Sequence, residues 1–304
     1  MRFNSRPLAL ARGWEFFSLF HYARKEIYSN IILNLLLRRY YMKNLIRVSS
    51  LFLSVFLAIL SLTGCYKSSE NIKKHNEDTV IVGYDNTFVP MGFLNNKGIP
   101  SGFDIDLAKE VFSRLNMNVK FQNIDWSMKD VELNSGNIDI LWNGYTLTDE
   151  RRKKVDYSNP YLNNNQVIVT MKNSSIKNID DLKNKIVATQ QGSSGLDILE
   201  KDAKLVNTFN NKAPILYDTF DNAFRDLESN RIDAVVVDEV LAKYYISKSK
   251  NNNFKILDDV LGKEVFVVGF KKGNIKLRDK VNNALDEVKQ DKTFDKIYNK
   301  WFNQ

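Results

Sequence analysis

Short runs of β-branched and other apolar residues alternate with segments of helical periodicity from Thr79 to the end of the chain. The short runs predict strands, and apolar residues that recur every three or four positions predict amphipathic helices. The expected strands are residues 79–83, 119–121, 138–142, 166–171, 185–189, 234–237 and 264–270. The expected helices are a long one capped by Asp104 and others near residues 179–182, 196–203, 219–229, 239–247, 275–288 and 293–301. This alternation predicts an α/β fold.

A short internal repeat indicates that the α/β region has two lobes. Residues 133–139 and 227–233 share Leu, Ser, Ile and Asp at the same offsets, and each segment joins an expected helix to an expected strand. The segments that follow these strands, 143–146 and 238–239, would then lie at equivalent carboxyl ends. Ligands of open α/β sheets bind at such ends. The repeat therefore points to these two segments as parts of a ligand site.

The N-terminal part of the chain contains a segment typical of secreted proteins. Residues 42–64 combine a short basic start, an apolar run and a small-residue stop, as a signal peptide does. The apolar run is shorter than the ~20 residues that span a bilayer. The sequence Leu-Thr-Gly-Cys that ends at Cys65 resembles a bacterial lipobox, which implies that Cys65 is lipidated and anchors the chain to a membrane outside the cytoplasm. Residues 65–78 would then be a tether. An uncleaved anchor helix is the alternative.

Residues 1–41 fit this interpretation poorly, because a complete signal peptide starts at Met42. We expect that an upstream start codon has been assigned wrongly. A second hydrophobic segment at residues 31–37 is the alternative.

Charge and reactive residues argue against several classes of protein. The chain carries a formal net charge of +8, but residues 1–64 hold nine basic and two acidic residues, so the rest is nearly neutral with 35 basic against 34 acidic. Nucleic acid is therefore not an expected partner. Cys65 is the single cysteine, and the two histidines, His21 and His75, precede the α/β region. No nucleophile elbow, Gly-rich phosphate loop or H-E-x-x-H motif is present. We expect a binding protein without metal or cofactor, although catalysis by a carboxylate or a lysine stays open.

Two kinds of residue in the α/β region suit a zwitterionic ligand. Arg151 lies in the first turn of a helix that Thr148 is expected to cap, where a guanidinium beside free backbone N–H groups favours a carboxylate. Ser193 and Ser194 follow a strand and open a helix, which is another place for an anion. Asp238 ends a buried strand and is a candidate partner for an ammonium group, or a helix cap.

Other candidates lie close to these in the sequence. Asp85 ends the first strand and has the same two interpretations as Asp238. Phe88, Trp126 and Tyr145 would shield a ligand from water, with core packing as the alternative.

Six motifs in a fixed order give the chain a resemblance to a known family. They are GYDNTFVPM, GFDIDLA, TDER, YSNPY, QGS and DE at residues 83–91, 102–108, 148–151, 157–161, 191–193 and 238–239. From about Thr79 to Gln304 the chain resembles the polar amino-acid-binding proteins of ABC transporters, which are bacterial extracellular solute-binding proteins of family 3. The resemblance implies the periplasmic binding protein type II fold, with a ligand cleft between two α/β lobes. Lobe 1 would hold residues 79–162 and 265–304 and lobe 2 residues 163–264, with chain crossings near 162–165 and 262–264.

The resemblance also implies a role for each candidate residue. Those implied for the ligand α-carboxylate are Arg151, the backbone of Thr146, and Ser193 or Ser194. Those implied for the α-ammonium group are Asp238, the Gly144 carbonyl and the Thr146 hydroxyl. Phe88 and Trp126 would sandwich the ligand side chain. Asp85 matches a position that contacts a cationic side chain in some relatives and also occurs in glutamine binders, while Tyr84, Asn143 and Glu239 are specificity candidates.

The function implied is an extracytoplasmic receptor that delivers a polar amino acid to the permease of an ABC importer. Glutamine, cystine and basic amino acids all stay open as ligands, and a monomer is expected. Two alternatives are a carboxylate-dependent enzyme of the dehydratase type, for which Glu239 is the candidate, and a ligand-sensing module.

Overall fold

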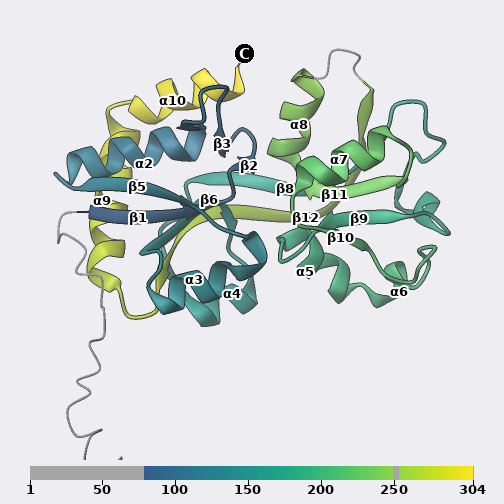
Figure 1. Ribbon diagram of the computed structural model, residues 1–304, viewed down its shortest axis with the longest axis horizontal. Coiled ribbons are helices and arrows are strands. Elements are labelled where there is room, and N and C mark those ends of the chain that lie inside the picture. The colour runs from purple at the N-terminus through teal and green to yellow at the C-terminus, as the bar shows by residue number, and fades with distance from the viewer. Residues whose placement is uncertain (1–78, 249–252, 304) are drawn as a thin grey trace, which may run out of the picture. The chain divides into compact units, whose positions relative to one another are not determined.

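The computed structural model describes residues 79–248 and 253–303, which form a mixed α/β structure (Figure 1). The predicted signal peptide, the lipidation site at Cys65 and the tether lie outside these residues. The predicted α/β class is confirmed, because a large sheet carries helices on its faces.

One nine-stranded sheet organises the described residues. Its strand order is β10-β9-β11-β8-β12-β6-β1-β5, and β7 also pairs with β12. The strands are β1 (Thr79–Tyr84), β5 (Asn118–Asn123), β6 (Ile140–Thr146), β7 (Val155–Tyr157), β8 (Leu162–Met171), β9 (Val187–Gln190), β10 (Ile215–Tyr217), β11 (Ala234–Asp238) and β12 (Phe254–Lys271). A separate three-stranded sheet holds β2 (Thr87–Phe88), β3 (Gly92–Leu94) and β4 (Pro100–Ser101).

Nine described α-helices pack around these sheets. They are α2 (Phe103–Arg114), α3 (Lys129–Ser135), α4 (Asp149–Lys154), α5 (Ser194–Lys201), α6 (Ala203–Val206), α7 (Phe220–Glu228), α8 (Glu239–Lys248), α9 (Ile275–Gln290) and α10 (Thr293–Phe302). In α2 and α7 the apolar residues recur at helical spacing and are buried, so each helix covers the sheet with one face. Burying one such side chain stabilises the fold by about 1.5 to 3 kcal/mol.

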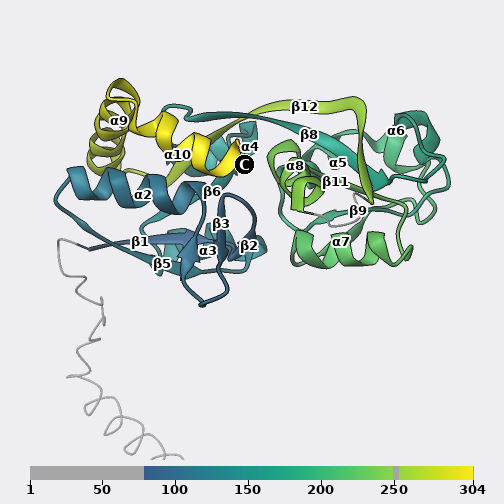
Figure 2. The same ribbon diagram turned by 90° about the horizontal axis from the view of Figure 1, so that it is seen from above.

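Two long antiparallel strands, β8 and β12, connect two halves of the molecule (Figure 2). We call the elements β1 to β7 with α2, α3, α4, α9 and α10 the first half, and β9 to β11 with α5 to α8 the second half. Glu264 on β12 pairs with Asn164 on β8, and Gly262 pairs with Gln166. These registers lie at the predicted chain crossings, and the predicted lobe boundaries stay a prediction.

The internal repeat has the same structure in each half. Asp139 accepts a hydrogen bond from the Ile81 N–H at 2.7 Å through its carboxylate, and Asp233 accepts one from the Ile186 N–H at 2.7 Å. Gly136 and Asn230, at equivalent positions, both have left-handed backbone, with φ of 78° and 54°. Each repeat thus ends a helix and ties the next strand to its neighbour.

Several elements differ from their predictions. Ile179–Leu182 is a short 3₁₀ turn, and β12 begins at Phe254 instead of residue 264. The early part of β12 was missed because its apolar alternation is interrupted by Asp258, Asp259 and Lys263. Helix α3 was expected before the strand of the first repeat but without bounds, because Leu133 is its only buried apolar residue and leaves no periodicity to detect.

Candidate functional site

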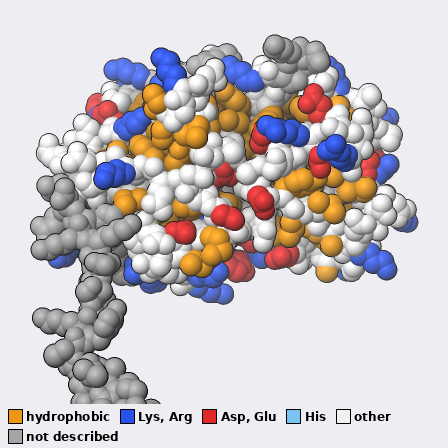
Figure 3. All heavy atoms as spheres, viewed as in Figure 1, with side chains coloured by type: hydrophobic (Ala, Val, Ile, Leu, Met, Phe, Trp, Pro, Cys, Tyr) orange, Lys and Arg blue, Asp and Glu red, His pale blue; other side chains and the backbone are white. Residues whose placement is uncertain are grey.

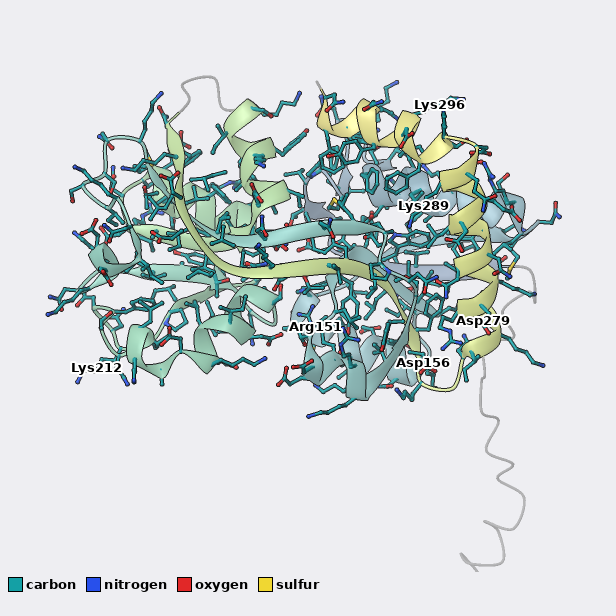
Figure 4. All side chains as sticks on the ribbon, turned by 180° about the vertical axis from the view of Figure 1, so that it is seen from behind. Arg151, Asp156, Lys212, Asp279, Lys289 and Lys296 are labelled. Atoms are coloured by element: carbon teal, nitrogen blue, oxygen red, sulfur yellow. The ribbon has the colours of Figure 1, made fainter. Side chains whose placement is uncertain are left out.

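Arg151 is held at the inner end of the first half and reaches the second (Figure 4). As predicted, Thr148 caps its helix, and the Thr148 hydroxyl accepts a hydrogen bond from the Arg151 N–H at 3.3 Å. The side chain is buried, with Nη1 donating to the Thr146 carbonyl and Nη2 to the Gly192 carbonyl, both at 3.0 Å. Its ion pair is with Asp197 at 3.7 Å. A guanidinium has five N–H donors, so this buried cation keeps donors for a further carboxylate.

The serines at the start of α5 have different surroundings. The Ser193 hydroxyl caps the helix by accepting a hydrogen bond from the Leu196 N–H at 3.1 Å. The Ser194 hydroxyl lies 3.2 Å from the Thr146 hydroxyl and 3.1 Å from Glu264 Oε2. Ser194 therefore joins the residues around Arg151, whereas the structure gives Ser193 a capping bond.

Asp238 ends β11 and is almost fully buried. Its Oδ1 accepts a hydrogen bond from Asn164 Nδ2 at 2.6 Å. Burial raises the pKa of this carboxyl, and the charge of Glu264 raises it further. A buried carboxylate beside a second carboxylate destabilises the folded protein unless a cation pairs with it.

Glu264 is a functional candidate that the sequence did not reveal. Its Oε2 accepts hydrogen bonds from residues of both halves and of β8. The donors are the Thr146 hydroxyl at 3.0 Å, Asn164 Nδ2 at 3.3 Å, Gln166 Nε2 at 3.1 Å and the Ser194 hydroxyl at 3.1 Å. Thr146 also binds Arg151 through its carbonyl. One network therefore runs from Arg151 to Asp238.

Asp85 and Asn143 form a second polar group. Asn143 Oδ1 accepts a hydrogen bond from the Asp85 N–H at 3.0 Å. Asp85 Oδ2 accepts one from Gln190 Nε2 of the second half at 2.8 Å, and its pKa is raised, chiefly by burial. Asn143 Nδ2 is buried and has no partner among residues 79–248 and 253–303. This donor and the Asp85 carboxylate are suited to a polar side chain.

The two predicted aromatic walls are buried at the same site. The Phe88 ring contacts Phe220 of the second half, with 6.0 Å between centroids, and lies against Gly144, where a Cβ would come within 2.7 Å of it. Gly144 has a φ of 55°, so both backbone and space favour glycine. Trp126 lies 6.1 Å from Tyr145, whose ring is 4.9 Å from the Arg151 guanidinium.

Asp104 positions Gly144 instead of capping a helix. Helix α2 starts at Phe103 with Gly102 as its cap, so the predicted cap is wrong. The Asp104 side chain is fully buried and accepts hydrogen bonds from the Gly144 N–H at 2.6 Å and the Tyr161 hydroxyl at 2.9 Å. Burial raises the pKa of Asp104 to about 7.

Lys129 is another residue that the sequence did not reveal. Its Nζ donates to the Gly192 carbonyl at 2.8 Å and to the Trp126 carbonyl at 3.2 Å. Burial and the charge of Arg151 lower its pKa to about 8. Arg151 and Lys129 thus contact the same carbonyl of the second half.

The arrangement separates charges of opposite sign, with guanidinium and ammonium groups around Gly192 and carboxylates around Asn164. Within the described part of the chain, no His, Cys, Asp and Glu residues are grouped so that they could hold a metal ion. Glu239 contacts Asn165 and Lys243. No helix in the described ranges has the length and apolarity to cross a bilayer.

The chain is similar to known binding proteins over most of its length. Residues 80–304 match the bacterial extracellular solute-binding proteins, family 3. The L-cystine-binding protein TcyJ of Escherichia coli (strain K12) is 30% identical over 232 residues, which cover 76% of this chain and 85% of that protein. The probable amino-acid-binding protein YxeM of Bacillus subtilis (strain 168) is 31% identical over 260 residues, which cover 84% of this chain and 94% of that protein.

Solved structures of binding proteins are also similar to this chain. An ABC uptake transporter substrate-binding protein from Streptococcus pneumoniae, solved with bound histidine, is 41% identical with a TM-score of 0.73, and the match covers 78% of this chain and 98% of that one. An ancestral arginine-binding protein bound to glutamine is 40% identical with a TM-score of 0.69, and the match covers 76% of this chain and 100% of that one. The predicted type II fold is confirmed, and so is the prediction of a binding protein instead of an enzyme, because the relatives are binding proteins. The chain belongs to the bacterial extracellular solute-binding proteins of family 3.

Proposed function

We propose that the protein is an extracytoplasmic receptor that captures a polar L-amino acid between its two halves and delivers it to the permease of an ABC importer. One observation carries this proposal: a buried guanidinium, Arg151, and a buried carboxylate, Asp238, belong to one hydrogen-bond network. The α-carboxylate and α-ammonium groups of a free amino acid are bonded to one carbon and carry the complementary charges. Ligands of this kind are recognised by such fixed, paired charges.

The relatives support an amino acid with a polar side chain. Their names or bound ligands are cystine, arginine, histidine and glutamine. We propose glutamine, cystine or a basic amino acid for this chain as well. Asp85, Asn143, Phe88 and Trp126 would contact the side chain, since they surround the network with polar groups and aromatic rings.

Binding would favour a closed arrangement of the two halves, which we propose are the lobes. Arg151 already contacts Gly192 across them, and Asp85 contacts Gln190. An amino acid held by Arg151 of the first half and by Ser194 and Asp238 of the second touches both halves, so it stabilises the closed form through contacts that an open form lacks. The permease would recognise the closed form.

A thermal-shift screen tests the ligand class. The purified protein, refolded to remove any carried-over ligand, is heated with each common L-amino acid and with cystine. We expect one or two polar amino acids to raise the melting temperature by several degrees, because a ligand at 100 times its Kd adds about 2.7 kcal/mol of stability. If none of them shifts the melting temperature, the protein does not bind a standard amino acid and the proposal fails.

We also propose that a lipid on Cys65 anchors the receptor to the outer face of the cell membrane. The lipobox-like sequence supports this, and Cys65 lies outside the described residues. Replacing Cys65 with serine is expected to move the protein from the membrane fraction to the medium or periplasm, because a lipid chain is the proposed anchor. A Cys65→Ser variant that stays in the membrane fraction would instead indicate an uncleaved helix.

A further inference from the structure

Two carboxylates share a single amide at the centre of the site. Asn164 Nδ2 donates to Asp238 Oδ1 at 2.6 Å and to Glu264 Oε2 at 3.3 Å. When both carboxyl groups are ionised, the nitrogen is the only atom of this amide that can donate to them. Asn164 is 4% exposed, and its Oδ1 has no hydrogen-bond partner among residues 79–248 and 253–303. Three groups of acceptors therefore meet here, one of them without a donor.

Glu264 also sets the direction of the Thr146 hydroxyl. A carboxylate can only accept, so the Thr146 hydroxyl donates its single hydrogen to Glu264 Oε2 at 3.0 Å. The Ser194 hydroxyl faces one lone pair of the Thr146 oxygen at 3.2 Å, and the other lone pair remains to accept a hydrogen bond from another group. The Ser194 hydroxyl is 3.1 Å from the same carboxylate oxygen, which places Glu264 between the two halves.

The local charges do not balance. The two cations of the site meet at the Gly192 carbonyl: Arg151 on α4, which is also paired with Asp197 at 3.7 Å, and Lys129 on α3. Asp238 on β11 and Glu264 on β12 face the same amide without a cation within 4 Å in the described part of the chain. Figure 3 shows acidic side chains gathered near the middle of one face, where the halves meet. A ligand that carries only a carboxylate would leave this excess of acceptors unpaired.

We propose that Glu264 is a further residue of the ammonium site: with Asp238, Asn164 Oδ1 and the oriented Thr146 hydroxyl, it selects ligands with a positively charged α-amino group. This inference rests on the proposed function and deepens it. Glu264 acts by its negative charge and by orienting Thr146, so a neutral side chain of the same shape would keep the contacts between strands and lose the selection.

The test is Glu264→Gln, with Asp258→Asn as its control. Gln keeps an oxygen that can accept from Thr146, and exposed Asp258 on the same strand undergoes the same change of charge. Affinity is measured by calorimetry between pH 5 and 9 for L-arginine, L-glutamine, L-histidine and L-cystine. At pH 8.5 we expect Glu264→Gln to weaken binding about 10- to 100-fold, since a hydrogen bond to a charged group is lost.

The pH profile separates this role from a merely structural one. Protonated Asp238 cannot pair with an ammonium group, so wild-type affinity should rise with pH until Asp238 is ionised. Removing the charge of Glu264 lowers the pKa of Asp238, and the midpoint of this rise should move down by about one pH unit. The titration of the amino acid itself cancels in the comparison.

The affinities of the two variants and of the wild type show whether Glu264 belongs to the ammonium site. Weaker binding together with the shifted midpoint, and a control that matches the wild type, supports the proposal. Unchanged affinity, an equal loss at every pH, or an equal effect of Asp258→Asn overturns it and leaves the proposed function intact. A wild-type protein that binds none of the four amino acids overturns the proposed function, and this inference with it.

Discussion

Arg151→Ala is expected to abolish amino-acid binding while the protein stays folded. The guanidinium is the group best placed to hold the ligand carboxylate, since Arg151 is 5% exposed and two of its guanidinium nitrogens donate to carbonyls, one in each half. Without it, a carboxylate would be buried without a paired charge, which costs on the order of 3 to 5 kcal/mol, or about 10²- to 10³-fold in affinity. Calorimetric titration with the amino acid that stabilises the wild type measures this loss.

Arg152 offers a matched control for this experiment. It is the next residue of the same helix, but its side chain is 45% exposed and contacts Tyr157 and Asp149. Arg152→Ala should therefore bind as the wild type does. Arg151→Lys keeps the charge but not the planar fork, so it should recover only part of the affinity. Wild-type affinity in folded Arg151→Ala would refute the assignment of Arg151 to the ligand carboxylate.

Residues whose environment is set by their own element could be predicted from the sequence. The Thr148 cap and the place of Arg151 in the first turn follow from T-D-E-R after a strand, and Asp238 follows a short β-branched apolar run that is typical of a buried strand. The fold class was predictable for the same reason, since the periodicity of each long element is local.

Residues whose environment is built by distant segments were not predictable. Glu264 lies in a strand of ordinary composition, and its four partners come from β6, β8 and α5, up to 118 residues away. Lys129 resembles any exposed helix lysine until Gly192 of the other half is placed against it. Asp104 has the sequence of a helix cap, and only its contact with Gly144 shows that it supports the site from within the core.

Asp238→Asn should have opposite effects on binding and on stability. The wild-type carboxylate is buried beside Glu264, so its charged form destabilises the folded protein, whereas an asparagine of the same shape keeps the hydrogen bond from Asn164. We expect the variant to lose amino-acid binding by about 100-fold or more, because the ammonium group loses its buried counter-ion. At pH 8 its free energy of unfolding should exceed that of the wild type by about 1 to 3 kcal/mol.

The difference in stability between Asp238→Asn and the wild type should grow as the pH rises. Because the folded-state pKa of Asp238 is raised, the folded wild type holds a proton that the unfolded chain has lost, and its free energy of unfolding falls as the pH rises from about 4 through the raised pKa. The Asn variant lacks this component of the fall and keeps the one that Asp104 contributes up to a pKa of about 7. Urea unfolding of both proteins between pH 4.5 and 8.5, with Asp258→Asn as the control, measures the difference. A variant that is less stable than the wild type at every pH would show that Asp238 stabilises the fold, which contradicts its proposed role as the partner of a ligand ammonium group.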